Sequence, residues 1–70
     1  MVTFNIVDKD GTIWARRVQA PTCIRVASYL LGSQDPHSFT VTKFDSCEVG
    51  TPVDLVEFCK RRNIAPMGTR

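Results

Sequence analysis

A DKDG turn at residues 8–11 separates two segments, 2–7 and 12–19, in which successive side chains alternate between two faces. A period of two residues is typical of a β-strand with one buried face. A short turn that ends in glycine joins such strands as a hairpin, because glycine adopts the left-handed conformation without strain. The two strands must then be antiparallel, which fixes the first half of the fold.

The same turn resembles the middle of a calcium-binding loop, and its spacing decides whether it can hold an ion. An EF-hand loop needs an acidic residue at its first position, glycine at its sixth and glutamate at its twelfth. If Gly11 is the sixth residue, Ile6 is the first and Arg17 is the twelfth. A calcium ion would lose two carboxylate ligands and lie beside a cation. We therefore predict a hairpin turn and no metal there.

The cysteines and the histidine do not form a metal-site pattern. Cys23, Cys47 and Cys59 include no C-x-x-C pair, and His37 is the single histidine. A structural zinc site needs four ligands in short clusters, and disulfide-stapled domains carry more cysteines in an even number. We predict no metal, no cofactor and no disulfide, interpret the cysteines as small buried side chains, and interpret His37 as a solvated loop residue.

Residues 20–22 break the second strand, and residues 23–32 change to a helical period. Pro21 suits the first turn of a helix, and Gly32 suits its C-terminal cap. The buried stripe is expected to comprise Ile24, Ala27 and Leu31, with Cys23 and Leu30 beside it. After a polar loop, residues 38–44 return to a two-residue period and are predicted to form a third strand.

The second predicted helix has the clearest end signals. Thr51 is a natural N-cap, Pro52 fits the first helical position, and Asp54 can accept a free N–H near the start. At the other end Asn63 can adopt the left-handed cap and Ile64 can fold back on the last turn. The expected stripe comprises Leu55, Phe58, Cys59 and Arg62, with Val56 alongside.

The element order is therefore ββαβα, which indicates an α+β fold. A right-handed crossover through the first helix places the third strand beside the first. We predict a three-stranded antiparallel sheet of order 2-1-3, with two helices on one face and the other face free. Residues 1–66 are predicted to form a single domain, followed by a flexible tail at 67–70.

Charge and hydropathy narrow the function classes. Nine lysines and arginines against seven acidic residues give a net charge of +2, a smaller excess than is expected of a domain that depends on phosphate contacts. No apolar run is long enough for a signal peptide or a membrane span, so we predict a cytoplasmic protein without a membrane partner. The chain has no nucleophile elbow, phosphate-binding glycine loop or histidine pair, and we predict no catalytic residues and no enzymatic activity.

The free face of the sheet is the first candidate binding surface. An exposed tryptophan beside an arginine would anchor a protein partner or stack a base. The alternative for this tryptophan is a place in the core or at its edge. The side chains expected on the face are Thr3, Asn5, Thr40 and Thr42, with Trp14, Arg16 and Phe44 as possible further members.

Two other surfaces are candidates. The cluster of Lys60, Arg61 and Arg62 would contact phosphates or an acidic partner, or would only complement the dipole at the helix end. The second strand, if it lies at the sheet edge, would form a homodimer by strand pairing, which Arg16 and Arg17 discourage. The residues predicted to bind a partner are Trp14, Arg16, Arg17, Lys43, Lys60, Arg61 and Arg62.

The segment TIWARRVQAPTCIRVASYLLG followed by SFTVTKFDSC, within residues 12–47, resembles the minimal strand-helix-strand pattern of small phage-encoded host-takeover inhibitors, including inhibitors of bacterial RNA polymerase and anti-CRISPR proteins. The resemblance is one of size and pattern, and no motif carries a functional residue across. It implies a cytoplasmic inhibitor of a host protein complex. Many such inhibitors are acidic mimics of nucleic acid, from which this slightly basic chain departs, so direct occlusion of a protein surface is expected.

Two functions follow as hypotheses. The first is a protein-binding module that occludes a surface of a host nucleic-acid machine, such as RNA polymerase or a CRISPR complex. The second is a small RNA- or DNA-binding domain that uses its arginines and lysines, whose affinity would fall steeply with salt concentration.

Overall fold

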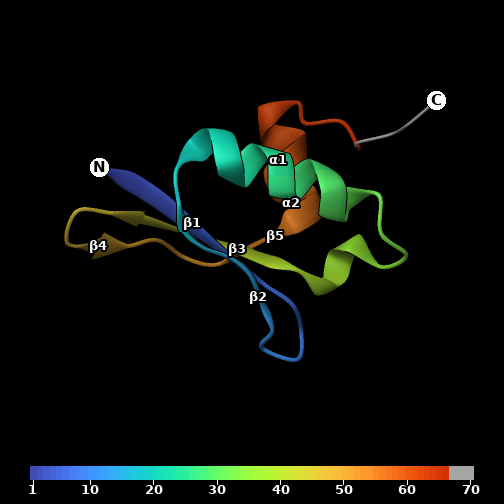
Figure 1. The fold of residues 1–70 in the computed structure, drawn as a ribbon, viewed down its shortest axis with the longest axis horizontal. Helices are drawn as coiled ribbons and strands as arrows, with labels where there is room; N and C mark the ends of the chain where they lie inside the picture. The colour runs from blue at the N-terminus through green and yellow to red at the C-terminus, as the bar shows by residue number, and fades with distance from the viewer. Residues whose placement is uncertain (67–70) are drawn as a thin grey trace.

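In the computed structural model, which describes residues 1–66, a sheet lies beneath two helices (Figure 1). The predicted flexible tail, residues 67–70, lies outside the described residues. The elements in chain order are β1 (Val2–Val7), β2 (Ile13–Val18), α1 (Ala20–Leu31), the 3-10 helix η1 (Pro36–Ser38), β3 (Thr40–Asp45), β4 (Glu48–Val49), β5 (Val53–Asp54) and α2 (Leu55–Arg62).

The strand order confirms the predicted 2-1-3 arrangement and the α+β class. The order is β2-β1-β3-β4, β5 also pairs with β3, and each of these pairings is antiparallel. The central pair, β1 with β3, has an unbroken register from Val2 opposite Asp45 to Val7 opposite Thr40. The sheet has five strands rather than the predicted three. β4 and β5 are only two residues long, which is too short for alternation to reveal them.

Both helices cover the same face of the sheet, as predicted (Figure 1). Phe4 and Ile6 of β1 point to that side, and the rings of Phe4 and Phe58 meet edge to face with their centroids 5.9 Å apart. The helices and the sheet therefore share one hydrophobic core. Its buried members are Phe4, Ile6, Ala15, Cys23, Ala27, Leu30, Phe39, Val41, Leu55, Phe58 and Cys59.

The buried stripe of α1 is rotated from the predicted one. Cys23, Ala27 and Leu30 are buried, whereas the side chain of Ile24, which was expected in the stripe, is 39% exposed. Ala27 belongs both to the predicted row, with Ile24 and Leu31, and to the observed row, with Cys23 and Leu30. The local sequence therefore allows either row to face inward. Contacts of α1 with β1 on one side and with α2 on the other select the Cys23 row.

The predicted start of α2 is wrong. Residues 51–54 are not helical, because Val53 and Asp54 pair with β3 as β5. Asp54 is the N-cap, and its Oδ2 accepts hydrogen bonds from the backbone N–H groups of Val56 and Glu57 at 3.1 and 3.3 Å. Sequence signals placed the cap at the first suitable residue, whereas pairing with β3 moves it along the chain.

The predicted end of α2 is confirmed. Asn63 has a φ of 56°, in the left-handed region. The N–H of Ile64 donates to the carbonyl of Cys59 at 2.9 Å, and Ile64 packs against the core. This combination is a Schellman motif with its usual hydrophobic contact.

Two irregularities interrupt β2. Phe4 is opposite Val18 but Ile6 is opposite Ala15, so Arg16 and Arg17 both face Asn5. Arg17 has a φ of 50°, and its N–H donates to the Asn5 Oδ1 at 2.6 Å. The two residues opposite Asn5 form a β-bulge in β2. The strain of the left-handed Arg17 backbone is offset by its hydrogen bond to the Asn5 side chain.

Candidate binding surfaces

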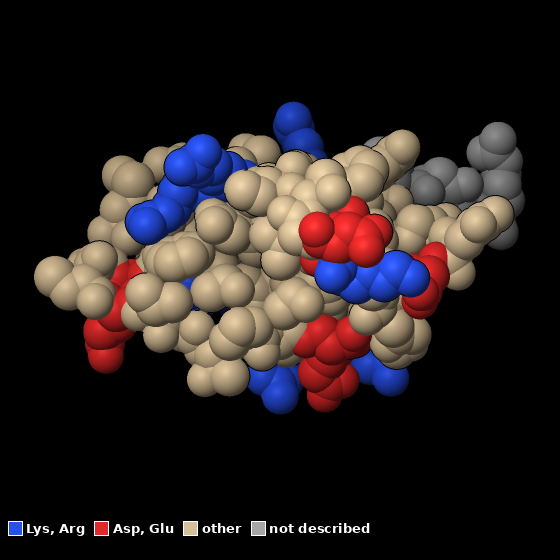
Figure 2. Space-filling view, turned by 90° about the horizontal axis from the view of Figure 1, so that it is seen from below, with Lys and Arg blue, Asp and Glu red and all other residues tan. Residues whose placement is uncertain are grey.

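The face of the sheet opposite the helices is uncovered in the described chain. The register places Thr3 beside Phe44, Asn5 beside Thr42 and Val7 beside Thr40, and all six side chains are partly exposed. Figure 2 views this side and shows an uncharged central area with charged side chains around its border. We call this surface the open face. It is defined by Thr3, Asn5, Val7, Thr40, Thr42 and Phe44.

Apolar side chains extend the open face at both ends. Val49 pairs with Phe44 and is 69% exposed, and Ile13 pairs with Val7 and is 51% exposed. The guanidinium of Arg17 lies over the ring of Phe44, 4.2 Å from its centroid. An aromatic ring with a stacked arginine, among exposed aliphatic side chains, is typical of protein interfaces.

Trp14 lies at the core edge, which is the alternative that the sequence left open. It is the extra residue of the second irregularity in β2. Its ring meets the buried ring of Phe39 edge to face at 5.9 Å, while 47% of the residue stays exposed. Its Nε1 donates to the Asp8 Oδ2 at 3.2 Å. Trp14 is therefore bound to the first hairpin turn, and Arg16 is exposed on β2 without adding to a tryptophan–arginine pair on the open face.

The Asp8 carboxylate organises that turn and makes it sensitive to acid. The backbone N–H of Thr12 is the main cause that lowers the pKa of Asp8 below 3.8, with further help from Trp14 and Asp10. A lowered folded-state pKa adds stability that is complete above the unfolded pKa and is lost as pH falls through the folded value.

We therefore expect the free energy of unfolding to decrease below about pH 4, and we expect Asp8→Asn to show a smaller decrease because it has no carboxylate to protonate. Urea unfolding followed by Trp14 fluorescence at neutral and acidic pH measures both. If the free energy of unfolding decreases at acidic pH as much in Asp8→Asn as in the unsubstituted protein, groups other than Asp8 cause the decrease.

The basic residues of β3 and α2 that are predicted to bind a partner line different grooves of the structure. Lys43, Arg61 and Arg62 line one groove between α2 and the β3–β5 side of the sheet, with a volume of about 520 Å³. Lys60 instead lines a second groove of about 650 Å³, near His37 and the end of the described chain. We call the first of these the basic groove. It is lined by Phe4, Val41, Lys43, Gly50, Thr51, Val53, Phe58, Arg61 and Arg62.

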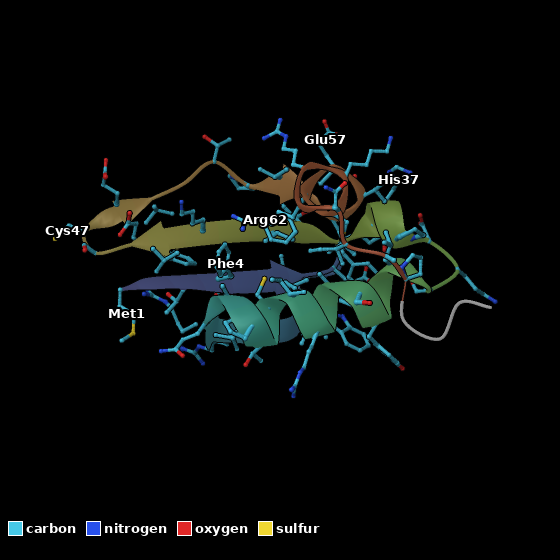
Figure 3. The ribbon with its side chains drawn as sticks, turned by 90° about the horizontal axis from the view of Figure 1, so that it is seen from above. Met1, Phe4, His37, Cys47, Glu57 and Arg62 are labelled. Carbon is cyan, nitrogen blue, oxygen red and sulfur yellow. The ribbon has the colours of Figure 1, made fainter. Side chains whose placement is uncertain are left out.

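Arg62 is held against aromatic rings within the basic groove. Its guanidinium lies 4.9 Å from the centroid of Phe58 and 5.6 Å from that of Phe4. Figure 3 shows Arg62 on the side of α2 that is nearer to Phe4, with Glu57 on the opposite side of the helix. Arg62 therefore does more than complement the helix dipole, and no spacing along the chain predicts that Lys43 lines the same groove.

The cysteines differ in their surroundings. Cys23 and Cys59 are buried, whereas Cys47 is exposed in the β3–β4 turn, so the expectation of three buried cysteines is wrong for Cys47 (Figure 3). Ser46 in this turn has a φ of 53°, a conformation that the sequence does not signal with glycine or asparagine. Burial raises the pKa of Cys23 to about 11 and also raises that of Cys59.

We expect one of the three thiols to react rapidly with Ellman's reagent in the native protein at about pH 8. Cys47→Ser should abolish the fast phase, because the buried thiols stay protonated and inaccessible. Denaturant should expose the thiols of Cys23 and Cys59 to the reagent. Rapid native reaction of Cys47→Ser would show that a buried thiol becomes accessible without unfolding.

Among residues 1–66, no group of three or more His, Cys, Asp or Glu side chains is placed to hold a metal ion. Neither α1 nor α2 has the length and apolar character needed to cross a membrane. Comparisons with protein families, with curated proteins and with solved structures gave no match.

Proposed function

We propose that the protein is a non-enzymatic protein-binding module that docks its open face on a host protein complex. The observation that carries the proposal is the open face, whose six defining side chains are uncharged (Figure 2), together with the stack of Arg17 on Phe44 and the exposed side chains of Val49 and Ile13. Exposed apolar surface of this kind marks interaction sites in small domains. With the phage-type resemblance, the partner is inferred to be RNA polymerase or a CRISPR complex in the host cytoplasm.

Docking by the face is better supported than docking by the edge. β2 does lie at the edge of the sheet, as a strand-paired homodimer requires. However, its two irregularities break the regular row of backbone groups that another strand would need. The alternative of an RNA- or DNA-binding domain has less support, because Arg17 lies on the open face whereas Lys43, Arg61 and Arg62 lie on the helix side. These residues do not form one track for a phosphate backbone.

The test introduces a charge at the centre of the open face. Thr42→Arg places a guanidinium among uncharged side chains, and Tyr29→Arg places the same group on the exposed surface of α1, where Tyr29 is 63% exposed. We expect the unsubstituted protein and Tyr29→Arg to bind purified bacterial RNA polymerase or a CRISPR effector complex and inhibit it at stoichiometric concentrations. Thr42→Arg should bind at least about tenfold more weakly, because the new charge is desolvated in the interface.

Circular dichroism of both variants establishes that they are folded. The absence of binding to either complex, together with no stoichiometric partner from a bacterial lysate, would contradict the proposed function. Undiminished binding by Thr42→Arg would show that another surface makes the contact.

A further inference from the structure

The basic groove has walls that come from distant parts of the chain. α2 supplies Phe58, Arg61 and Arg62, and the β3–β5 side supplies Val41, Lys43, Gly50, Thr51 and Val53. Its volume of about 520 Å³ is within the usual range for sites that hold a small ligand or a few residues of a peptide. The groove is on the helix side of the sheet, so it is separate from the open face.

The floor of this groove is apolar and already packed. Phe4 and Phe58 are 2% and 8% exposed, and Val41 is also buried. These side chains belong to the hydrophobic core, so their position is fixed without a ligand. Val53 also lines the groove and is only half-buried, so an aliphatic side chain from outside can contact it at little cost in reorganisation of the fixed lining.

The rim of the groove is cationic and has little internal neutralisation. Within residues 1–66, Lys43 and Arg62 form no ion pair. The Arg61 Nε lies 3.9 Å from the Glu57 Oε1, a long distance for an ion pair, and both side chains are largely exposed. Such an exposed pair contributes little and is easily exchanged for another carboxylate. Asp45 and Glu48 line a separate shallow hollow beside Lys43, and no acidic side chain lines the groove itself.

Arg62 is preorganised for a carboxylate. Its guanidinium is held over two rings, so it has less conformational freedom to lose on binding than a free arginine. A planar guanidinium binds a carboxylate through two parallel hydrogen bonds. The groove therefore combines an apolar floor with fixed positive charges on its rim.

From this charge complementarity we propose that the basic groove binds an acidic peptide segment of a partner protein, in which an aliphatic side chain is flanked by aspartates or glutamates. The apolar side chain lies against Val53, which is half-buried and also lines the groove, and the flanking carboxylates meet the cations on the rim. A nucleic acid fits less well, because both rings are buried and covered by Arg62, which leaves no aromatic face on which a base can stack.

The experiment uses a fluorescein-labelled peptide with two central leucines and glutamates on both sides, and fluorescence anisotropy measures its binding at low salt. The double variant Lys43→Gln/Arg61→Gln removes two rim charges and leaves the Arg62 stack in place. Arg16→Gln, which removes one exposed charge outside the groove, is the control. We expect saturable binding by the unsubstituted protein, a loss of at least about tenfold in the double variant, and a change of less than about twofold in Arg16→Gln.

The same peptide with glutamine in place of glutamate should bind weakly or not at all. No saturable binding of the glutamate peptide, or equal binding by the double variant, would overturn the proposal. Tighter binding of a single-stranded DNA oligonucleotide, weakened by Arg16→Gln as well, would replace it with a nucleic-acid surface. Because Thr42→Arg leaves the groove intact, it should bind the peptide normally even if the open-face function fails.

Discussion

Leu30→Ala is expected to lower the free energy of unfolding by about 2–5 kcal/mol, because it leaves a cavity in a closely packed core. Leu30 is only 1% exposed and lies in the row of α1 that faces the sheet and α2. A chain of this length has a total stability of roughly 4–10 kcal/mol, so this one substitution removes a large share of it. Urea or thermal unfolding followed by circular dichroism measures the loss.

Ile24→Ala in the same helix is the matched control. The sequence pattern places Ile24 in the buried stripe, whereas the structure leaves it 39% exposed. We expect a loss below about 1 kcal/mol, since less apolar area is removed from the protein interior and alanine is the better helix former. Equal losses in the two variants would mean that α1 is rotated toward the predicted stripe.

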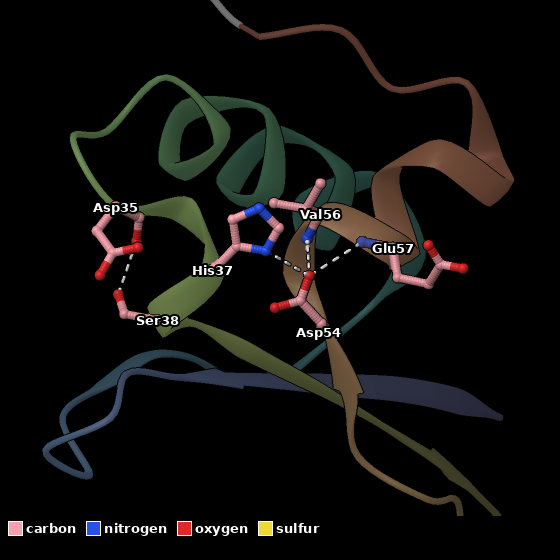
Figure 4. Close-up of polar contacts among 6 residues, drawn as sticks. All are labelled: Asp35, His37, Ser38, Asp54, Val56 and Glu57. Atoms are coloured by element: carbon pink, nitrogen blue, oxygen red, sulfur yellow. Dashed lines mark hydrogen bonds and ion pairs between the residues drawn. The ribbon is translucent and has the colours of Figure 1, made fainter.

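Asp54→Ala is expected to cost about 1–2 kcal/mol, because it removes the N-cap of α2. One carboxylate oxygen accepts from the N–H groups of Val56 and Glu57 and also lies 3.3 Å from the His37 Nδ1 (Figure 4). Asp54 therefore fixes the start of α2 and connects it to η1. For a domain of this size, the expected decrease in Tm is about 4–8 °C for each kcal/mol lost.

Asp54→Asn separates the cap from the charge. Asparagine accepts the same backbone hydrogen bonds at an N-cap, but it has no charge to interact with His37. We expect it to recover most of the stability lost in Asp54→Ala, because an exposed ion pair contributes little. If Asp54→Asn were as unstable as Asp54→Ala, the charge rather than the capping geometry would be responsible.

Local chemistry in the sequence was sufficient for much of the fold. The glycine-ended turn predicted the first hairpin, and Asn63 with Ile64 predicted how α2 ends. Each of these signals acts within a few residues. The start of α2 was not predictable in this way, because Asp54 becomes the cap only when Val53 pairs with Val41 of β3.

The candidate surfaces were likewise predictable only where local alternation determines which side chains share a face. Alternation identified Thr3 and Thr42 on the open face, because β1 and β3 are regular and keep one register. In β2 the irregularities change which side chains share a face, so alternation could not decide between the open face and the core edge for Trp14. The basic groove depends on how α2 lies across β3, and no spacing along the chain brings Lys43 to Arg62.

The pairing of Val2 with Asp45 also has a consequence for the order of events during synthesis. β1 leaves the ribosome first, yet its partner β3 is made only after α1 and the following loop. Until then β1 has β2 alone beside it, and an isolated hairpin is marginally stable in water. Closing so long a loop is entropically costly and slow. We therefore expect the nascent chain to gain protease resistance late, once the residues that follow β3 have emerged from the exit tunnel.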